Sequence, residues 1–295
     1  MVTEERTQRK DRLNGPVLRY PGGKWRKGTW IIRHMPHPSH WSYYVEGFGG
    51  GANVMLQMFH KFPVPVQRVY NETDGRVSNF FEVIQDKKAR RKLRKKLHYT
   101  PWARSEWERG WIQHEDPIED ARRLCCHLWM SYSAFRNDIG SFRGGFAKSN
   151  GHAGIDQWYK IGNRIELAAE VFRGVIIQKE DAVRLFQKTD NPKTLHYLDP
   201  PYVPEARGGS QRSFGRQYKE DDGMALQERL IGELAKGPEG FVILSGYDNQ
   251  FYNDNLPDWK KVSSSATTCN GGRRTEVLWL SPRVADSICM TTLFE

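Results

Sequence analysis

The stretch Thr194-Leu195-His196-Tyr197-Leu198-Asp199-Pro200-Pro201-Tyr202 decides the fold. Its first five residues predict a short buried strand, and its last four place a carboxylate, two prolines and an aromatic ring at that strand's C-terminal end. Open α/β sheets bind their ligands at this edge. Asp199 can accept a hydrogen bond from an amino group, the prolines present carbonyls on a stiff backbone without N–H groups, and Tyr202 offers a flat face to a base. The alternative interpretation is an ordinary turn at a strand end.

Short apolar runs alternate with helical patterns along the rest of the chain, which predicts an α/β sheet that is mainly parallel. The last two strands are joined through Asn270-Gly271-Gly272 without a helix, so we expect an antiparallel pair at the sheet edge. The expected strands are Tyr43–Glu46, Val66–Tyr70, Val175–Ile177, Leu195–Leu198, Phe241–Ser245, Lys260–Ser264 and Val277–Leu280. The expected helices include Val54–Phe62, Val77–Leu97, Ile118–Phe135, Gly162–Val171 and Asp221–Lys236.

Composition favours a nucleic-acid partner. The 295 residues carry a formal net charge of +10, and clustered Lys and Arg gain affinity for phosphates through counterion release. The four cysteines form no C-x-x-C pair, which argues against a zinc ribbon or an iron–sulfur cluster. No apolar run approaches the length of a membrane span, and the charged residues 1–12 do not resemble a signal peptide. Pro36 and Pro38 interrupt the spacing of His34, His37 and His40, so we expect no metal site there.

A glycine-rich segment from Glu46 to Asn53 joins a predicted strand to a predicted helix. Glycines allow a sharp turn and a close approach to a ligand, and a helix N-terminus favours negative charge. Glu72 ends the next strand and is spaced to bind ribose hydroxyls. Gly47, Gly49 and Ala52 also satisfy the dinucleotide pattern G-x-G-x-x-G/A, so a nicotinamide-dependent dehydrogenase is a rival interpretation.

Three segments taken together resemble a known family. Tyr20-Pro21-Gly22-Gly23-Lys24, Val45-Glu46-Gly47-Phe48-Gly49-Gly50-Gly51 and Asp199-Pro200-Pro201-Tyr202 occur in the order found in Dam-type (alpha-arrangement) DNA adenine N6-methyltransferases. Asn71-Glu72-Thr73-Asp74 and Arg274–Leu280 also match the family. Departures are Gly47 where the family often has proline and Ala52 where glycine is common. The resemblance implies a Rossmann-like methyltransferase sheet and S-adenosylmethionine as the cofactor.

The resemblance also assigns roles to residues. It implies that Asp199, Pro200, Pro201 and Tyr202 form the catalytic pocket, in which Asp199 and the Pro200 carbonyl accept the N–H bonds of a flipped adenine. The cofactor would be bound by Tyr20, Gly23, Lys24, Glu46, Gly47, Phe48, Gly49, Gly50, Gly51, Glu72, Asp181 and Asp199. No metal is required. The same pocket is compatible with methylation of the cytosine N4 amino group, and a DNA-binding protein without catalytic activity is a third alternative.

Residues 87–163 are rich in aromatic and charged side chains but contain no clear strand, so they predict an inserted, mainly helical lobe. In the family the target-recognition domain lies at this position. We therefore expect a flexible tail (1–13), a catalytic domain (14–86 and 164–295) and an inserted helical target-recognition domain (87–163). The expected partner is double-stranded DNA, in the cytoplasm of a prokaryotic cell or of a virus-infected host. Candidate DNA contacts are Lys92, Lys95, Lys96, Tyr132, Phe135, Arg136, Asn137, Arg143, Arg207 and Arg212.

Overall fold

A computed structural model describes residues 13–61, 66–131, 142–144, 151–202, 220–267 and 273–292. The chain divides into two compact units. The first comprises Met1–Thr29, Gly50–Pro63 and Glu72–Lys179, and the second comprises Trp30–Gly49, Val64–Asn71 and Glu180–Glu295. The domain boundaries expected at residues 87 and 163 stay a prediction. Among the described helices we find none whose length and apolar character would let it cross a lipid bilayer.

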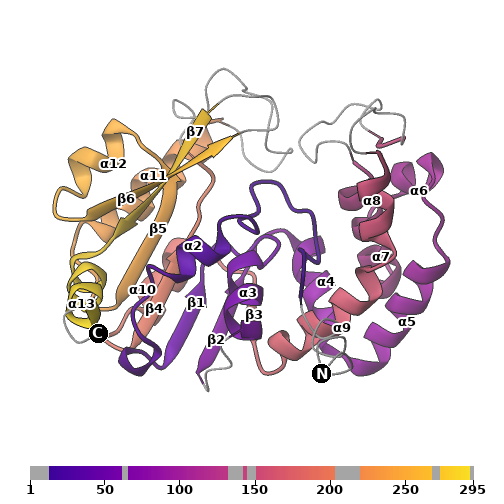
Figure 1. The fold of residues 1–295 in the computed structure, drawn as a ribbon, viewed down its shortest axis with the longest axis horizontal. Coiled ribbons are helices and arrows are strands. Elements are labelled where there is room, and N and C mark those ends of the chain that lie inside the picture. The colour runs from indigo at the N-terminus through magenta and orange to yellow at the C-terminus, as the bar shows by residue number, and fades with distance from the viewer. Residues whose placement is uncertain are drawn as a thin grey trace, which may run out of the picture. The chain divides into compact units, whose positions relative to one another are not determined.

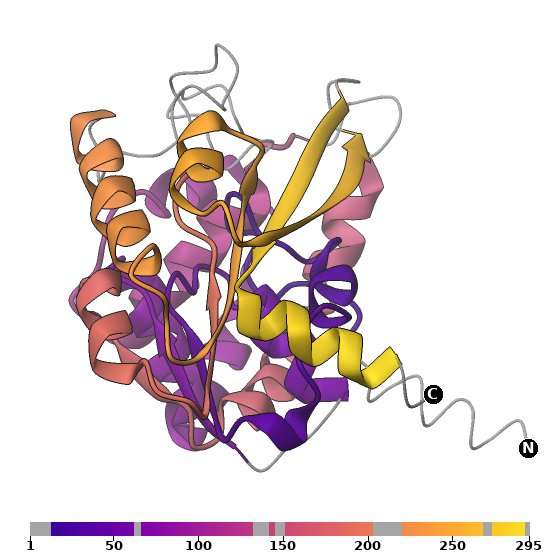
Figure 2. The same cartoon turned by 90° about the vertical axis from the view of Figure 1, so that its left-hand side faces the viewer.

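The second unit contains a mixed sheet with the strand order β2-β1-β4-β5-β7-β6 (Figure 1). The strands are β1 (Tyr43–Glu46), β2 (Gln67–Asn71), β4 (Thr194–Leu198), β5 (Phe241–Tyr247), β6 (Lys260–Thr267) and β7 (Arg273–Leu280). The pairs β1–β2, β1–β4 and β4–β5 are parallel, whereas β5–β7 and β6–β7 are antiparallel. Figure 2 shows β6 and β7 side by side at this edge. The predicted α/β sheet with an antiparallel edge pair is therefore confirmed.

Strand order places β4 inside the sheet, between β1 and β5. All five β4 residues are buried, because the strand has a neighbour on each side and covered faces. In register, Glu46 at the end of β1 lies beside Tyr197 of β4. Parallel strands end at the same edge of a sheet, so the loop that begins at Gly47 and the tetrapeptide that begins at Asp199 leave the sheet at the same edge.

Helices of the second unit cover this sheet. They are η1 (Pro38–His40), α10 (Ala182–Thr189), α11 (Glu220–Leu234), α12 (Gln250–Asn255) and α13 (Pro282–Thr292). A buried cluster joins α11 to β5 and β7 through Leu230, Ile231, Leu244 and Trp279. Burial of this apolar surface fixes α11 against β5, which neighbours β4, and against β7. It contributes a free energy of about 25 cal/mol per Å² of apolar surface removed from water.

The first unit is mainly helical. It contains α3 (Asn53–Lys61), α4 (Gly75–Gln85), α5 (Lys87–Tyr99), α6 (Arg104–Arg109), α7 (Pro117–Met130), α8 (Gly151–Trp158), α9 (Ile161–Phe172) and the short strand β3 (Ile176–Gln178). The helix α2 (Gly28–Ile32) begins in this unit and ends in the second. The described part of residues 87–163 has no strand longer than an isolated bridge between Ser131 and Phe142, as the predicted helical lobe requires.

Two helix predictions in this unit were wrong in their bounds. The single helix expected over Val77–Leu97 is two helices, because Asp86 ends α4 and caps α5, its carboxylate accepting from the Ala89 N–H at 2.6 Å. Aspartate competes for backbone N–H groups and so favours caps over helix interiors. The helix expected to reach Phe135 ends at Met130, where Ser131 adopts extended backbone and pairs with Phe142.

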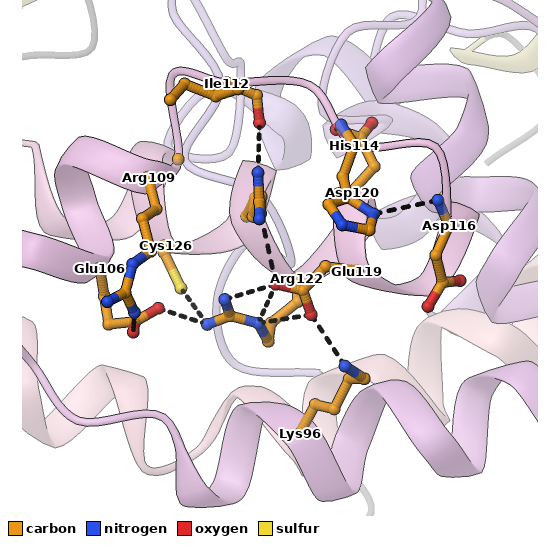
Figure 3. A network of polar contacts seen from close by, with 12 residues as sticks. Lys96, Glu106, Arg109, Ile112, His114, Asp116, Glu119, Asp120, Arg122 and Cys126 are labelled. Atoms are coloured by element: carbon orange, nitrogen blue, oxygen red, sulfur yellow. Dashed lines mark hydrogen bonds and ion pairs between the residues drawn. The ribbon is translucent and has the colours of Figure 1, made fainter.

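A polar network centred on Arg122 of α7 holds α5, α6 and α7 together (Figure 3). Its guanidinium donates to Glu106 at 2.6 Å and to Glu119 at 2.7 Å, and Lys96 of α5 donates to Glu119 at 2.8 Å. The hydrogen bonds from Arg122 lower the pKa of Glu119 to about 2, although partial burial opposes this shift. Charged groups this close to buried surface need such partners, because an unpaired one carries a large desolvation cost.

Candidate active site

The predicted catalytic tetrapeptide, Asp199–Tyr202, follows β4 directly. Asp199 is half-buried, Pro200 is buried, and Pro201 and Tyr202 are half-buried. Two successive prolines fix φ and give no N–H, so they cannot continue a β ladder. The sequence thus ends the strand at Leu198 and places Asp199 and the two prolines directly beyond that strand end.

Two side chains from other elements hold the end of the tetrapeptide. Gln227 of α11 donates from Nε2 to the Pro201 carbonyl. The Tyr202 hydroxyl donates to Glu276 of β7 at 2.9 Å, and the Tyr202 ring lies edge-on to Tyr247, with centroids 4.4 Å apart. Burial raises the pKa of Tyr202, and the negative charge of Asp199 raises it further. The ring that we expect beside a base is therefore a neutral phenol held from two sides.

The loop after β1 is held close to the sheet. The Gly47 N–H donates to the Tyr197 carbonyl at 3.2 Å, and the Gly49 N–H donates to the Asn71 carbonyl at 2.8 Å. A Cβ on Gly47 would lie 2.8 Å from Leu198, and one on Gly49 would lie 2.1 Å from Tyr70. A side chain at Gly49 would displace the buried Tyr70 ring, whereas one at Gly47 would need only a Leu198 methyl group to shift, so glycine matters more at position 49.

Glu46 precedes this loop and is 2% exposed, with the Tyr44 hydroxyl donating to it at 3.0 Å. Asn71, which we did not select from the sequence, organises the same region. Its Nδ2 donates to the carbonyls of Gly47 and Glu180 at 3.0 Å each, and its Oδ1 accepts from the Glu180 N–H at 2.9 Å. The sequence signal for this role lies in the segment Asn71-Glu72-Thr73-Asp74. There a polar residue ends a buried strand, and such a residue needs a specific set of hydrogen-bond partners.

Asp181 lies one residue beyond Glu180 and caps α10. Its Oδ1 accepts from the Arg184 N–H at 3.0 Å and from Arg229 Nη2 of α11 at 2.7 Å. Partial burial raises its pKa, but the Arg229 hydrogen bond and the backbone N–H groups outweigh this and leave the pKa lowered. Asp181 is thus a carboxylate with a fixed orientation, suited to accept from an amino group.

In the first unit, the N-terminal element forms a tight turn. The Gly23 N–H donates to the Tyr20 carbonyl at 3.1 Å, and Gly22 has φ +71°. Proline followed by a glycine of positive φ is the pattern of a type II turn. Lys24 is 7% exposed, and its ammonium donates to the Gly22 carbonyl at 3.2 Å. The turn therefore places a cation beside backbone groups.

Glu72 and Gly50 form a second cluster of the first unit. The Glu72 carboxylate accepts from the Gly50 N–H at 2.8 Å and from the Asp74 N–H at 2.9 Å, while burial raises its pKa. Gly50 has φ +46°, and a Cβ there would lie 2.8 Å from the Tyr20 ring. Ala52 has φ +51°, a conformation that costs a non-glycine residue energy and occurs often near functional sites.

The predicted DNA contacts separate into three groups. Lys92 and Lys95 are exposed on α5, whereas Lys96 is bound to Glu119. The Arg143 backbone is fixed by its N–H donating to the Met130 carbonyl at 2.7 Å and by Trp102 Nε1 donating to its carbonyl at 2.9 Å. Tyr132, Phe135, Arg136, Asn137, Arg207 and Arg212 lie outside the described residues.

The residues fit S-adenosylmethionine as the bound group. Carboxylates suit the hydroxyl and amino groups of an adenosine, a lysine suits its methionine carboxylate, and the glycine backbone permits close approach. Within the described residues no group of His, Cys, Asp and Glu is arranged to hold a metal ion. Fold and site together define the class of methyltransferases that use S-adenosylmethionine.

The comparison with protein families names the group within that class. Residues 20–264 match the family model of D12 class N6 adenine-specific DNA methyltransferases. The chain belongs to this Dam-type family, so its substrate is DNA and its cofactor is S-adenosylmethionine. This decides against the nicotinamide-dependent dehydrogenase, which had rested on the glycine spacing alone.

Two further comparisons add little. No curated protein matches the chain. Among solved structures, the chain is similar to an rRNA methyltransferase, aviRa, from Streptomyces viridochromogenes, with 12% sequence identity and a TM-score of 0.37 over 91% of this chain and 89% of that chain.

Proposed function

We propose that this enzyme methylates N6 of an adenine flipped out of double-stranded DNA, and that Asp199 and the Pro200 carbonyl accept the two amino N–H bonds. One observation carries the proposal: the tetrapeptide leaves the inner strand β4 directly, with a carboxylate followed by two residues that lack N–H groups. Acceptors without adjacent backbone donors suit an amino group. A stacked and paired base cannot reach such a site and must first leave the helix.

The proposed chemistry must make a weakly nucleophilic amino group reactive. Its nitrogen lone pair is delocalised, so the nitrogen is a poor nucleophile until hydrogen bonds to both N–H groups favour tetrahedral geometry. S-adenosylmethionine would supply an electrophilic methyl group on its sulfonium. As the nitrogen bonds to the methyl carbon, the carbon–sulfur bond would break and its electron pair would stay on sulfur, so that neutral S-adenosylhomocysteine leaves. Because the nitrogen must lose a proton once it carries the methyl group, a carboxylate bonded to that N–H is in place to take it. Fixed geometry supplies much of the acceleration, on the order of 7–11 kcal/mol in favourable cases.

The cofactor contacts are proposed residue by residue from the family resemblance. Lys24 binds the methionine carboxylate, Glu72 the ribose hydroxyls and Asp181 the adenine amino group. The remaining contacts are Tyr20, Gly23, Glu46, Gly47, Phe48, Gly49, Gly50, Gly51 and Asp199. The support is that hydrogen bonds within the protein orient Glu72 and Asp181 before any ligand binds, so less entropy is lost on binding.

The exposed face of α5 supports duplex binding by the helical lobe, whose proposed extent is 87–163. Arg90 and Arg94 bind Glu166 and so belong to the packed side of the helix. Lys88, Arg91, Lys92 and Lys95 are exposed and form no ion pair within the described part of the chain. Their spacing of three and four residues sets them on one helix face, which we name the α5 basic face.

An exposed aromatic ring continues the α5 basic face. Tyr99 follows Lys95 by four residues and is 74% exposed. A row of cations with an aromatic ring at its end suits the phosphate backbone of DNA, which attracts any clustered positive charge and is read without regard to sequence. We propose that this face contacts phosphates beside the target site, and that the enzyme works in the cytoplasm of a prokaryotic or virus-infected cell.

A single assay tests the function. The protein is incubated with unmethylated duplex DNA and S-adenosylmethionine carrying a labelled methyl group, and the products are sequenced for modified bases and digested for mass spectrometry. We expect N6-methyladenine in one sequence context. Label in N4-methylcytosine alone would overturn the assignment of the base, and binding of DNA without any transfer would favour a protein that has lost the activity.

A further inference from the structure

A buried glutamine lies behind the catalytic tetrapeptide. Gln227 of α11 is 0% exposed, and its Nε2 donates to the Pro201 carbonyl. Its Oε1 accepts from the Tyr252 hydroxyl at 2.5 Å. A buried amide with both ends bonded is a specific arrangement, because each unmet hydrogen bond would cost free energy.

The tetrapeptide needs such a side chain because its backbone offers few donors. Pro200 and Pro201 have no N–H, so the ladder that fixes β4 cannot extend through them. Within this segment the peptide can be held mainly through its carbonyls. Gln227 takes the Pro201 carbonyl, which is not one of the two acceptors that we propose for the substrate.

The Pro201 carbonyl and the Tyr252 hydroxyl hold the two ends of the amide. A carbonyl oxygen can only accept, so Nε2 must face Pro201, and this leaves Oε1 to accept from the Tyr252 hydroxyl. Tyr252 is itself fixed, since its N–H donates to Asn249 at 2.8 Å and its ring lies edge-on to Trp279 with centroids 4.9 Å apart. These hydrogen bonds thus connect α12 to the tetrapeptide through α11, in the order Asn249, Tyr252, Gln227 and Pro201.

We propose that Gln227, held at its amide oxygen by Tyr252, is a positioning residue for methyl transfer, which sets the Pro201 backbone and thereby aims Asp199 and the Pro200 carbonyl at the target amino group. The inference rests on the proposed function, since it assumes that those two acceptors bind the adenine. A role of this kind affects the chemical step and leaves cofactor binding unchanged.

The test compares Gln227→Glu with the wild type over a range of pH, by single-turnover methyl transfer to a duplex of the recognised sequence. A protonated glutamic acid keeps one donor for Pro201 and one acceptor for Tyr252, whereas a carboxylate has no donor. Burial raises the pKa of a carboxyl group, so the variant loses its donor as the pH rises. We expect a rate constant on the order of tenfold to a hundredfold below the wild type at pH 8.5, with much of the loss recovered at pH 6.

Two measurements separate positioning from a general effect on folding. Calorimetry with S-adenosylmethionine should give wild-type affinity, and a duplex with 2-aminopurine as the target base should show the fluorescence rise of a flipped base. Tyr252→Phe keeps the ring but removes the hydroxyl that holds the amide oxygen, so it should lower the single-turnover rate severalfold with little change in the melting temperature. The exposed neighbour Glu228→Gln on the same helix is the matched control and should behave as the wild type.

The inference is overturned if Gln227→Glu and Tyr252→Phe transfer methyl groups as fast as the wild type at every pH. It is also overturned if the loss in Gln227→Glu is independent of pH and accompanied by weaker cofactor binding, which would indicate a damaged fold. Absence of transfer by the wild-type protein would instead contradict the proposed function itself.

Discussion

The Tyr202 hydroxyl donates a hydrogen bond of 2.9 Å to the Glu276 carboxylate and so ties the proposed catalytic tetrapeptide to the antiparallel strand β7. The predicted antiparallel edge of the sheet thus has a part in the site: it supplies the partner that sets the plane of the ring. A ring fixed in this way can stack on a base without first losing side-chain freedom.

This relationship predicts different outcomes for two substitutions of Tyr202. Tyr202→Ala removes the stacking surface, which is worth about 1–3 kcal/mol per base, so kcat/KM should fall by a factor between about 5 and 150. Tyr202→Phe keeps the ring and should lose less than about fivefold, because an intact ring still packs on Tyr247. Steady-state methylation of a cognate duplex measures both, and equal losses in the two variants would contradict a stacking role.

Asp199→Ala should abolish most methyl transfer. The substitution removes the acceptor that takes one amino N–H, and we expect kcat to fall by at least about a hundredfold. Affinity for S-adenosylmethionine, measured by calorimetry, should stay within a few fold because other proposed contacts remain. Turnover near the wild-type level in a correctly folded variant would defeat the assignment of Asp199 as the catalytic acceptor.

Gly50→Ala should weaken cofactor binding. Gly50 has φ +46°, where a side chain is strained, and the new Cβ would lie 2.8 Å from the Tyr20 ring. We expect a loss of about 1–2 kcal/mol in stability and weaker binding of S-adenosylmethionine, measured by thermal unfolding and calorimetry. Gly232→Ala is the matched control: Gly232 lies in α11 with no atom near a new Cβ, so alanine should stabilise the helix by roughly 0.5–1 kcal/mol.

The positions of the strands along the chain could be predicted because each strand has a strong local signal. Thr194–Leu198 and Phe241–Tyr247 are buried apolar runs, and the absence of a helix between the last two strands gave their antiparallel direction. Helix ends were harder to predict. Asp86 divides one amphipathic pattern into two helices, since the local competition of its carboxylate for backbone N–H groups does not alter the apolar period.

The segment that we propose for the reaction stands out in the sequence, whereas the residues that support it do not. Asp199 and Glu72 stand in recognisable motifs, whereas Gln227 lies in an ordinary helical pattern. Its bond to Pro201 joins segments 26 residues apart in sequence, and its partner Tyr252 lies 25 residues further along. Such long-range pairs depend on how the helices pack on the sheet, which no local pattern records.

Neutral substitutions on the α5 basic face should weaken DNA binding for all sequences alike. The plot of log K against log salt concentration has a negative slope, and each phosphate contact removed reduces its magnitude by about 0.9. The double variant Lys92→Gln with Lys95→Gln should therefore reduce the magnitude by roughly twice that amount. Fluorescence anisotropy at several salt concentrations measures the slope. Lys236→Gln, at an exposed residue in the turn after α11, is the control. A pair of variants with the wild-type slope would show that the face is merely solvated.

Acid should destabilise the protein in part through His196. This residue of β4 is 0% exposed, and burial lowers its pKa to about 3 in the folded state from the ordinary value of 6.5. Below pH 6.5 the His196 ring is therefore protonated in the unfolded chain, whereas in the folded chain it stays neutral down to about pH 3. Stability contributed by the neutral ring is complete above pH 6.5 and falls by about 1.4 kcal/mol per pH unit below it.

Urea unfolding between pH 7.5 and 4.5 tests this prediction through the variant His196→Leu. The variant should lose less stability with falling pH than the wild type, with the slope reduced by close to one proton at pH 5. Its stability relative to the wild type should improve steadily as the pH drops, whatever the packing change costs at pH 7.5. A slope equal to that of the wild type would mean that His196 is protonated inside the folded protein, and that its burial in β4 does not exclude the charge.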